Sequence, residues 1–544
     1  RDQYGDWKIL NWKSTIARPE NTNWKRYTFD KNNPTIQEQF DFFINYQIKE
    51  MYLRYFVWQF AGRGDKDDFP WYIKNLQGDL IGNQKLDGIN WLRYGFPLAL
   101  ILGIFGMYAH FTRDWKRALS VLSLFLATGL MIIIYLNQYD PQPRERDYSY
   151  VGSFFAFSIW IGIGAYMIMD LIKNKLNVAK IKQYINFEME QYKIHISAFM
   201  LFMLIPLNMC INDYYEHDRS QRYEAWDYAY NLLNSCDKNG ILFTNGDNDT
   251  FPLWYLQYVA KIRTDVKVVN LSLLNFPSYI RQLDEHSPSL KLFELSDQYL
   301  TAVESNDMGP LSELAADKWF TNKDNPRKVS VTTPKGTKFN WEFLGGNYGF
   351  GLTNLTIINI IEKCFDHNPI YFSITTGSNQ LGLNDYLSQE GLVLKLTNTK
   401  KSSLRTSNMN LEKTLELINT KYKYRNLNKS GIFYGPHIER IAAVYRNVFH
   451  EAANHMALAI NMKNNIETSY MIIELLDEYI PNTIVPEMEQ MTEYRKWEYY
   501  QTVLQYCMYM YEQEGGIPNN TMLFIKKKMP DLYSYINDMI TPSK

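Results

Sequence analysis

Two long apolar stretches, at residues 118–136 and 151–172, flank a short charged loop. Each is close to the roughly 20 residues that an α-helix needs to cross a hydrocarbon core about 30 Å thick. The loop, residues 140–148, reads DPQPRERDY. We therefore expect two membrane helices that hold a charged loop at the bilayer surface.

Two further apolar stretches, at residues 91–111 and 194–211, bring the expected number of spans to four. Basic residues fill two of the connections: Arg113, Lys116 and Arg117 in the first, and Lys173, Lys175, Lys180, Lys182 and Lys193 in the last. By the positive-inside rule these two connections are cytoplasmic, so residues 1–90, the loop at 140–150 and everything after residue 211 lie outside the cytoplasm. No ionisable residue lies in the middle of a span, which argues against a transporter.

The overall charge and the cysteine spacing exclude other classes. Lys+Arg 57 against Asp+Glu 58 gives a net charge of -1, with no long basic run, so a nucleic-acid partner has no support. The four cysteines lie far apart, which suggests neither a zinc site nor a disulfide framework. Because the chain begins at Arg1 inside a polar segment, we expect it to be part of a longer protein.

The parts outside the spans have two different patterns. Residues 212–400 alternate helix and strand, with strands expected at 241–245, 266–274, 328–332, 339–343 and 370–375, which favours a parallel α/β layer. Residues 401–544 are helical, with helices expected at 438–460, 466–479, 488–511 and 522–539. Their lengths suit tetratricopeptide-like hairpins, although no strict 34-residue period aligns. The expected fold class is mixed: four transmembrane helices, an extracytoplasmic α/β domain and a helical array.

A helical pattern also covers residues 36–60, within the segment at 1–90. Its dense aromatic side chains suit a membrane-water interface, and the alternative is a helix buried in a soluble domain of its own.

The turn after the strand at 241–245 contains Asp247, Asn248 and Asp249. Ligands bind at this end of the strands in α/β layers, and paired carboxylates there hold a divalent cation in some glycosyltransferases. The alternative is structural: Asp249 or Thr250 caps the next helix, with Pro252 in its first turn, while Asp247 closes an Asx turn. We expect the structural role to dominate, with no cofactor, although a divalent cation stays possible.

Arginines lie at two places that the topology puts on one side of the membrane. Arg144 and Arg146 occupy the loop between the second and third spans, and Arg219 and Arg222 follow the fourth. Guanidinium groups bind phosphate with paired donors, so these four residues are candidates for holding a lipid phosphate. The alternatives are contact with lipid head groups and pairing of the loop arginines with Glu145 and Asp147.

Common enzyme signatures such as Gly-x-Ser-x-Gly, His-Glu-x-x-His, a Walker loop or a dinucleotide fingerprint do not occur. Four strings taken together resemble the bacterial protein O-mannosyltransferase-like membrane family: LRYFVWQFAGR at 53–63, PRERDY at 143–148, HDRS at 217–220 and LFTNGDNDTFPLWY at 242–255. The resemblance covers nearly the whole chain and is most specific from residue 54 to residue 255.

This resemblance implies a GT-C-like glycosyltransferase in the bacterial inner membrane, with a periplasmic C-terminal domain. Such enzymes transfer a sugar, here mannose-like, from a polyprenyl-phosphate donor to Ser or Thr hydroxyls of an acceptor polypeptide outside the cytoplasm. The acidic first loop that carries their catalytic residue has no counterpart here, so the chain resembles the C-terminal part and its catalytic residue is unknown. The alternative is a non-enzymatic membrane-anchored scaffold that binds proteins or glycans.

Overall fold

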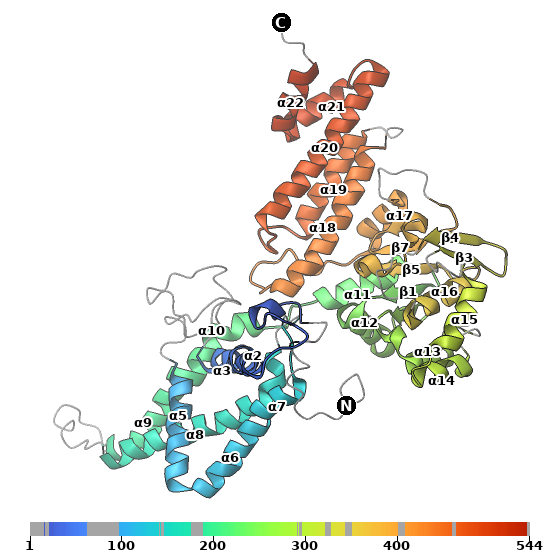
Figure 1. Cartoon of the computed structure of the whole chain (residues 1–544). Helices are drawn as coiled ribbons and strands as arrows, with labels where there is room; N and C mark the ends of the chain where they lie inside the picture. Colours follow the sequence, from blue (N-terminus) through green and yellow to red (C-terminus); the bar gives the residue numbers. More distant parts are fainter. Residues whose placement is uncertain are drawn as a thin grey trace. The chain divides into compact units, whose positions relative to one another are not determined.

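The computed structural model describes residues 16, 21–61, 97–140, 142, 146–175, 189–290, 292, 296–320, 328–342, 351–400, 408–459 and 464–540. The chain forms two compact units, Arg1–His217 and Asp218–Lys544, which we call the N-terminal and C-terminal units. Each is described by itself. The protein is mostly helical, with a small mixed sheet (Figure 1).

A continuous helical run near the start of the N-terminal unit confirms the helix expected at 36–60. It consists of α2 (Ile36–Phe42), the π-helical η2 (Phe43–Leu53) and α3 (Arg54–Phe60), after the short η1 (Trp24–Arg26). A capping box between Thr35 and Glu38 starts it. Its buried aromatic residues, among them Tyr52 and Tyr55, share a core with Ile133 and Phe154 of the apolar helices. The run therefore packs on those helices.

The remaining described elements of the N-terminal unit are mostly apolar helices. In chain order they are α5 (Leu98–Arg113), α6 (Trp115–Ala127), α7 (Leu130–Leu136), η3 (Asp147–Tyr150), α8 (Val151–Lys175), α9 (Met189–Phe202), η5 (Met203–Leu207) and α10 (Asn208–His217).

Two described helices are long and apolar enough to cross a membrane, Trp115–Leu136 and Asp147–Lys173, by length and composition. They coincide with the second and third expected spans, so the prediction of four spans is wrong in number. The other two candidates are shorter apolar helices, Leu98–Arg113 and Tyr192–Leu207. Sixteen residues rise only about 24 Å, less than a hydrocarbon core of about 30 Å, and residues 91–96 of the first lie outside the described part.

Glycines let α5 and α8 pack closely. A Cβ on Gly106 would lie 1.8 Å from the carbonyl oxygen of Trp160, and one on Gly164 would lie 2.1 Å from that of Leu102. These distances leave no space for any side chain. Small residues at a helix interface allow this close backbone approach, which is the usual way that helices associate inside a bilayer.

The C-terminal unit contains a five-stranded sheet with the strand order β2-β1-β5-β7-β6. Its strands are β1 (Ile241–Thr244), β2 (Lys267–Asn270), β5 (Ile370–Ser373), β6 (Leu387–Glu390) and β7 (Val393–Leu396). The first three are parallel, as expected, but β6 and β7 form an antiparallel hairpin that joins β5. The sheet is therefore mixed rather than wholly parallel.

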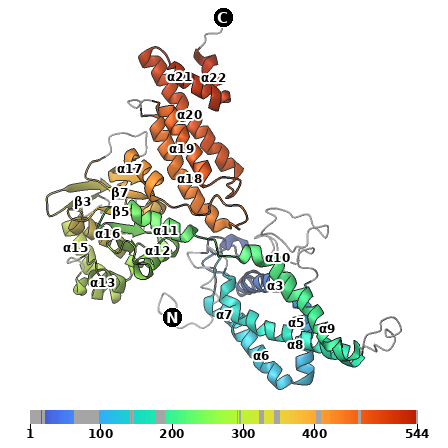
Figure 2. The same ribbon diagram turned by 180° about the vertical axis from the view of Figure 1, so that it is seen from behind.

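Both faces of the sheet are buried, and successive residues of β1 point into different cores. Leu242 belongs to a core with α11 (Glu224–Ser235), α12 (Gly246–Trp254) and the π-helical η6 (Tyr255–Val259). Phe243 belongs to the other, with α13 (Pro277–Glu285) and α16 (Leu352–Cys364). Figures 1 and 2 show these helices on the two sides of the sheet. A strand that is buried on both faces is expected to have a continuous run of mostly apolar residues, as β1 has.

The other elements around the sheet are short. They are η7 (Leu273–Asn275), α14 (Asp297–Glu304), α15 (Gly309–Lys318), the antiparallel pair β3 (Lys328–Thr332) and β4 (Lys338–Glu342), η9 (Ile374–Asn379), η10 (Leu383–Tyr386), α17 (Leu411–Glu416) and η11 (Leu417–Lys421).

The chain ends in a helical array of α18 (Pro436–Ala457), α19 (Asn465–Tyr479), α20 (Glu489–Glu514), α21 (Asn519–Lys528) and α22 (Pro530–Ile540). These helices contain 22, 15, 26, 10 and 11 residues, so they do not repeat a hairpin of constant size and give no support to a tetratricopeptide-like repeat. Their apolar residues join the core that contains Leu242. A domain boundary near residue 400 stays a prediction.

Candidate functional site

The strand order places a candidate site between β1 and β5. The chain passes from β1 to β2 on one side of β1 and later returns to β5 on the other side. The segments that follow two neighbouring parallel strands then diverge at their carboxyl ends, and in open α/β sheets this is where ligands bind. Here the two segments are the turn into α12 and the start of η9.

The turn after β1 is tight because of one glycine. Gly246 has a φ of 71°, in the left-handed region, and Asn245 before it is extended and forms the N-cap of α12. The prediction that Asp249 or Thr250 caps this helix is wrong, because both lie inside α12. Pro252 is also inside the helix rather than in its first turn.

Asp249 contacts the segment that follows β5. Its Oδ2 accepts a hydrogen bond from Oγ1 of Thr375, and that hydroxyl also bonds Oγ of Ser373 at 2.7 Å. Burial raises the pKa of Asp249, while the hydrogen bond from Thr375 lowers it. The result is a half-buried carboxylate with a raised pKa at the carboxyl ends of β1 and β5.

Tyr228 of α11 adds a buried hydroxyl close to this carboxylate. Its side chain is 6% exposed, and the hydroxyls of Ser373 and Thr375 lie close enough to lower its pKa. Burial first, and then the negative charge of Asp249, raises the pKa of Tyr228. Tyr228 therefore belongs to the same polar cluster as Asp249, Ser373 and Thr375.

A second group of polar side chains holds the turn in place. Thr250 Oγ1 bonds Thr244 Oγ1 at 2.7 Å and donates to the Gly246 carbonyl at 2.7 Å. Asn270, the last residue of β2, donates from Nδ2 to Thr250 Oγ1 at 3.0 Å. Thr250 therefore has the structural role expected of the turn, through hydrogen bonds rather than through capping.

Asp247 and Asn248 have exposed side chains on the same turn. Within the part of the chain that the structure describes, no three His, Cys, Asp or Glu side chains gather as a metal site requires. A divalent cation at Asp247 and Asp249 stays a prediction.

The four arginine candidates lie in different places. Arg144 is outside the described residues, whereas Arg146 is half-buried in the N-terminal unit, where its backbone N–H donates to the hydroxyl of Tyr55 at 3.1 Å. Arg219 and Arg222 belong to the C-terminal unit, and Arg222 forms a 2.6 Å ion pair with Glu224. Their joint action on a phosphate stays a prediction.

The loop that carries Arg146 is anchored by the N-terminal segment. Asp140, which is 6% exposed, accepts hydrogen bonds from Asn23 Nδ2 at 3.0 Å and from the Tyr27 hydroxyl at 2.6 Å. Gln47 donates from Nε2 to the Gln138 carbonyl at 2.9 Å. Residues 21–61 and this loop, which the expected topology puts on one side of the membrane, thus contact each other.

Sequence reasoning missed Tyr228, Ser373, Thr375 and Asp140. Tyr228 and Ser373 lie in patterns that indicate ordinary buried elements, so nothing local marks them. The signal that could have been used is the position of Ser373 and Thr375 at the end of a predicted parallel strand, the same criterion that selected Asp247 and Asp249.

Comparison with known proteins gives one match. Residues 225–312 match the family model described as TMEM260-associated domain 2, a range that includes α11, β1, the turn at Asp249 and β2. No curated protein and no solved structure matches the sequence.

Proposed function

We propose that this chain is the C-terminal part of a membrane glycosyltransferase-like protein whose C-terminal unit binds a hydroxyl-rich ligand between β1 and β5. The observation that supports this most is the half-buried Asp249 carboxylate at the switch point of the sheet, inside the range that matches the TMEM260-associated domain. TMEM260 is a family related to protein O-mannosyltransferases. Two helices long and apolar enough to span a bilayer agree with a membrane location.

The chemistry of the site around Asp249 suits a sugar or a Ser or Thr side chain. A carboxylate accepts hydrogen bonds from hydroxyl groups, and the Tyr228 hydroxyl can donate another. Asp249 would orient the hydroxyl that receives the sugar or one hydroxyl of the sugar itself. A carboxylate with a raised pKa is also suited to accept the proton that an acceptor hydroxyl loses on transfer.

The donor would be a polyprenyl-phosphate sugar, mannose-like, whose phosphate Arg144 and Arg146 would hold. Support comes from Arg146, whose Nε is buried and has no hydrogen-bond partner among the described residues. A phosphate oxygen would provide that partner, and guanidinium-to-phosphate bonds are charge-assisted. We place the protein in the bacterial inner membrane, with an acceptor polypeptide as the second substrate. Residues 218–544 would lie in the periplasm, which requires the shorter apolar helix Tyr192–Leu207 to cross the bilayer as well.

The test is binding to the chain of residues 1–544 in lipid nanodiscs. Polyprenyl-phosphate mannose should bind, and a Ser/Thr-containing peptide should bind to the donor complex. Asp249→Asn should weaken peptide or sugar binding about tenfold, since a charge-assisted hydrogen bond contributes about 1.5–3 kcal/mol. Asp247→Asn, on the exposed side of the same turn, is the matched control and should bind like wild type. Equal affinities of both variants and wild type would contradict the proposed site.

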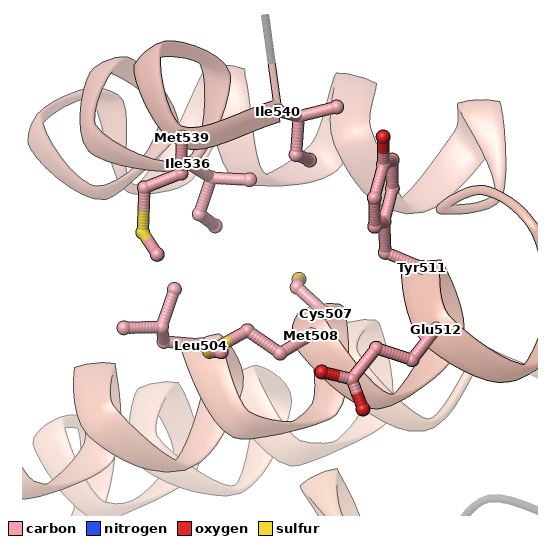
Figure 3. A pocket seen from close by; sticks show the side chains of 8 residues that line it. All are labelled: Leu504, Cys507, Met508, Tyr511, Glu512, Ile536, Met539 and Ile540. Atoms are coloured by element: carbon pink, nitrogen blue, oxygen red, sulfur yellow. The ribbon is translucent and has the colours of Figure 1, made fainter. Parts of the chain in front are cut away.

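A second candidate is the membrane-anchored scaffold, favoured by a cavity in the helical array. The cavity, of about 190 Å³, lies between α20 and α22, whose side chains face one another across it in Figure 3. It is lined by Leu504, Cys507, Met508, Tyr511, Glu512, Ile536, Met539 and Ile540. Such a cavity could hold an apolar side chain of a bound polypeptide. Peptide binding that Met508→Lys removes, without any donor binding, would favour this function.

A further inference from the structure

A separate cavity lies at the amino ends of the parallel strands, whereas Asp249 follows their carboxyl ends. It has a volume of about 200 Å³ and lies between η6, the start of β2 and the end of α13. Lys267, the first residue of β2, lines it, whereas the Asp249 site follows the last residues of β1 and β5. The two places are therefore at the amino and carboxyl ends of the parallel strands.

The Lys267 side chain is buried without a counter-ion. It is 8% exposed, and its Nζ donates one hydrogen bond, at 2.7 Å, to the backbone carbonyl of His286. Within the described residues no carboxylate forms an ion pair with it. Asp284, on the same helix end, uses both carboxylate oxygens to accept the backbone N–H of Leu292, at 2.9 and 3.1 Å.

The electrostatic cost of burying this charge lowers the pKa of Lys267. Burial lowers the pKa of Lys267 to about 8, while the negative charge of Asp284 acts in the opposite direction. At neutral pH the Lys267 side chain is therefore still protonated in most molecules. An ammonium group has three N–H donors, so two remain available after the bond to His286.

The other lining residues fit an anion better than a cation. Lys261 and His286 add basic groups, Gln282 adds an amide, and none of the described residues that line the cavity is acidic. Tyr279 contributes a flat apolar wall. Room for about seven water molecules, at about 30 Å³ each, is comparable with one small sugar.

We propose that this cavity binds a small anionic ligand, a sugar acid or a sugar phosphate, whose carboxylate or phosphate receives two hydrogen bonds from the Lys267 ammonium. The ligand would supply the direct ion pair that Lys267 does not form with any described residue, because Asp284 acts on it through its charge without pairing with it. Buried charges are usually paired, and a charge-assisted bond in a partly dehydrated cavity is stronger than a neutral one. This site does not depend on the function proposed for the Asp249 site.

The test is calorimetric titration of the chain of residues 1–544, purified in detergent, with four probes: glucuronate, mannose 6-phosphate, inorganic phosphate and neutral methyl mannoside. We expect at least one sugar anion to bind more than tenfold tighter than methyl mannoside. Comparison of glucuronate with mannose 6-phosphate identifies the preferred anion. Inorganic phosphate shows how much of the affinity comes from the charge alone.

Lys267→Met keeps the length of the side chain and removes its charge, and it should weaken anion binding at least tenfold. Lys238→Met, at an exposed lysine that does not line the cavity, is the matched control and should bind like wild type. Thermal unfolding checks that Lys267→Met is folded, which we expect because an apolar residue at a buried charged position is often tolerated. Wild-type anion affinity in folded Lys267→Met, or equal affinity for methyl mannoside and the anions, would overturn the proposal.

Discussion

The carboxylate of Asp249 accepts a hydrogen bond from the Thr375 hydroxyl, which is 126 positions further along the chain. This bond joins the segments that leave β1 and β5. Thr375→Val removes the donor at nearly constant volume and should lower the free energy of unfolding by about 1.5–3 kcal/mol at pH 7, as for other hydrogen bonds to charged groups.

The pH dependence of this loss tests its cause. The hydrogen bond lowers the pKa of Asp249 against the effect of burial, so it favours the charged carboxylate. The deficit of Thr375→Val should therefore be largest at neutral pH and decrease as acid protonates Asp249. Thr375→Ser should keep most of the stability. A deficit that does not change with pH would mean that the methyl group, rather than the hydrogen bond, matters.

The packing of α5 on α8 predicts opposite effects for two glycines two positions apart. Gly164→Ala places a Cβ 2.1 Å from the Leu102 carbonyl oxygen and should separate the helices, whereas nothing lies within 4 Å of a Cβ at Gly162. Gly162→Ala should be neutral or stabilise the helix by up to about 1 kcal/mol. Heating the detergent-solubilised variants before size exclusion measures both effects. Equal melting temperatures of the two variants would contradict the close packing of these helices.

Asp227 of α11 binds Arg425, which lies in the segment between η11 and α18. It is 2% exposed and accepts hydrogen bonds from Nε and Nη2 of Arg425 at 2.9 and 2.6 Å. Asp227→Ala should cost about 2–4 kcal/mol, because it leaves the guanidinium without its partner. Glu416→Ala, which breaks the more exposed pair with Lys413, should cost at most about 1 kcal/mol in the same denaturant titration. Similar losses for both variants would mean that the burial of Asp227 does not make its ion pair more stabilising than an exposed one.

His450 in α18 predicts a loss of stability in mild acid. Burial first, and then the positive charges of Arg495 and Arg446, lowers the pKa of His450 to about 4 from 6.5. The unfolded chain therefore binds a proton as the pH falls below about 6.5, while the folded chain does not until about 4, so stability is lost across this range. His450→Gln should weaken the dependence of the melting temperature on pH between 7 and 4. An unchanged slope would show that other groups cause the acid sensitivity.

The membrane topology is the subject of the last prediction. The basic connection at 173–193 is expected to be cytoplasmic. Residues 218–544 are then periplasmic only if the shorter apolar helix Tyr192–Leu207 also crosses the bilayer, which this prediction assumes. Alkaline phosphatase fused after Lys544 in a bacterial host should be active, and a fusion at Lys180 should be inactive. Activity from the fusion at Lys180 alone would show that the actual topology is the inverse of the predicted one.

Local sequence patterns were sufficient for the elements whose evidence is contiguous. The helical run at 36–60 and the strands near 241 and 370 were found because hydrophobic spacing reports burial over neighbouring residues. The apolar runs at 118–136 and 151–172 were found because length and composition mark a helix that can cross a bilayer. The same information placed Asp247 and Asp249 at the end of a strand. The local pattern could not distinguish the two shorter apolar helices from full spans, because a span is defined by helix length and the pattern does not fix where each helix begins and ends.

Tertiary structure alone decided which side chains meet. Asp249 meets Thr375 and lies near Tyr228 because the order β2-β1-β5 brings distant strand ends together, and hydrophobic spacing carries no information on strand order. The sequence did not predict the hairpin of β6 and β7. The burial of Lys267 also depends on tertiary structure, because its partner His286 follows α13, which covers the start of β2. Periodicity along the chain determines which face of an element is buried. What that face is buried against depends on contacts between residues far apart in sequence, and these also set the charge environment of Asp249 and Lys267.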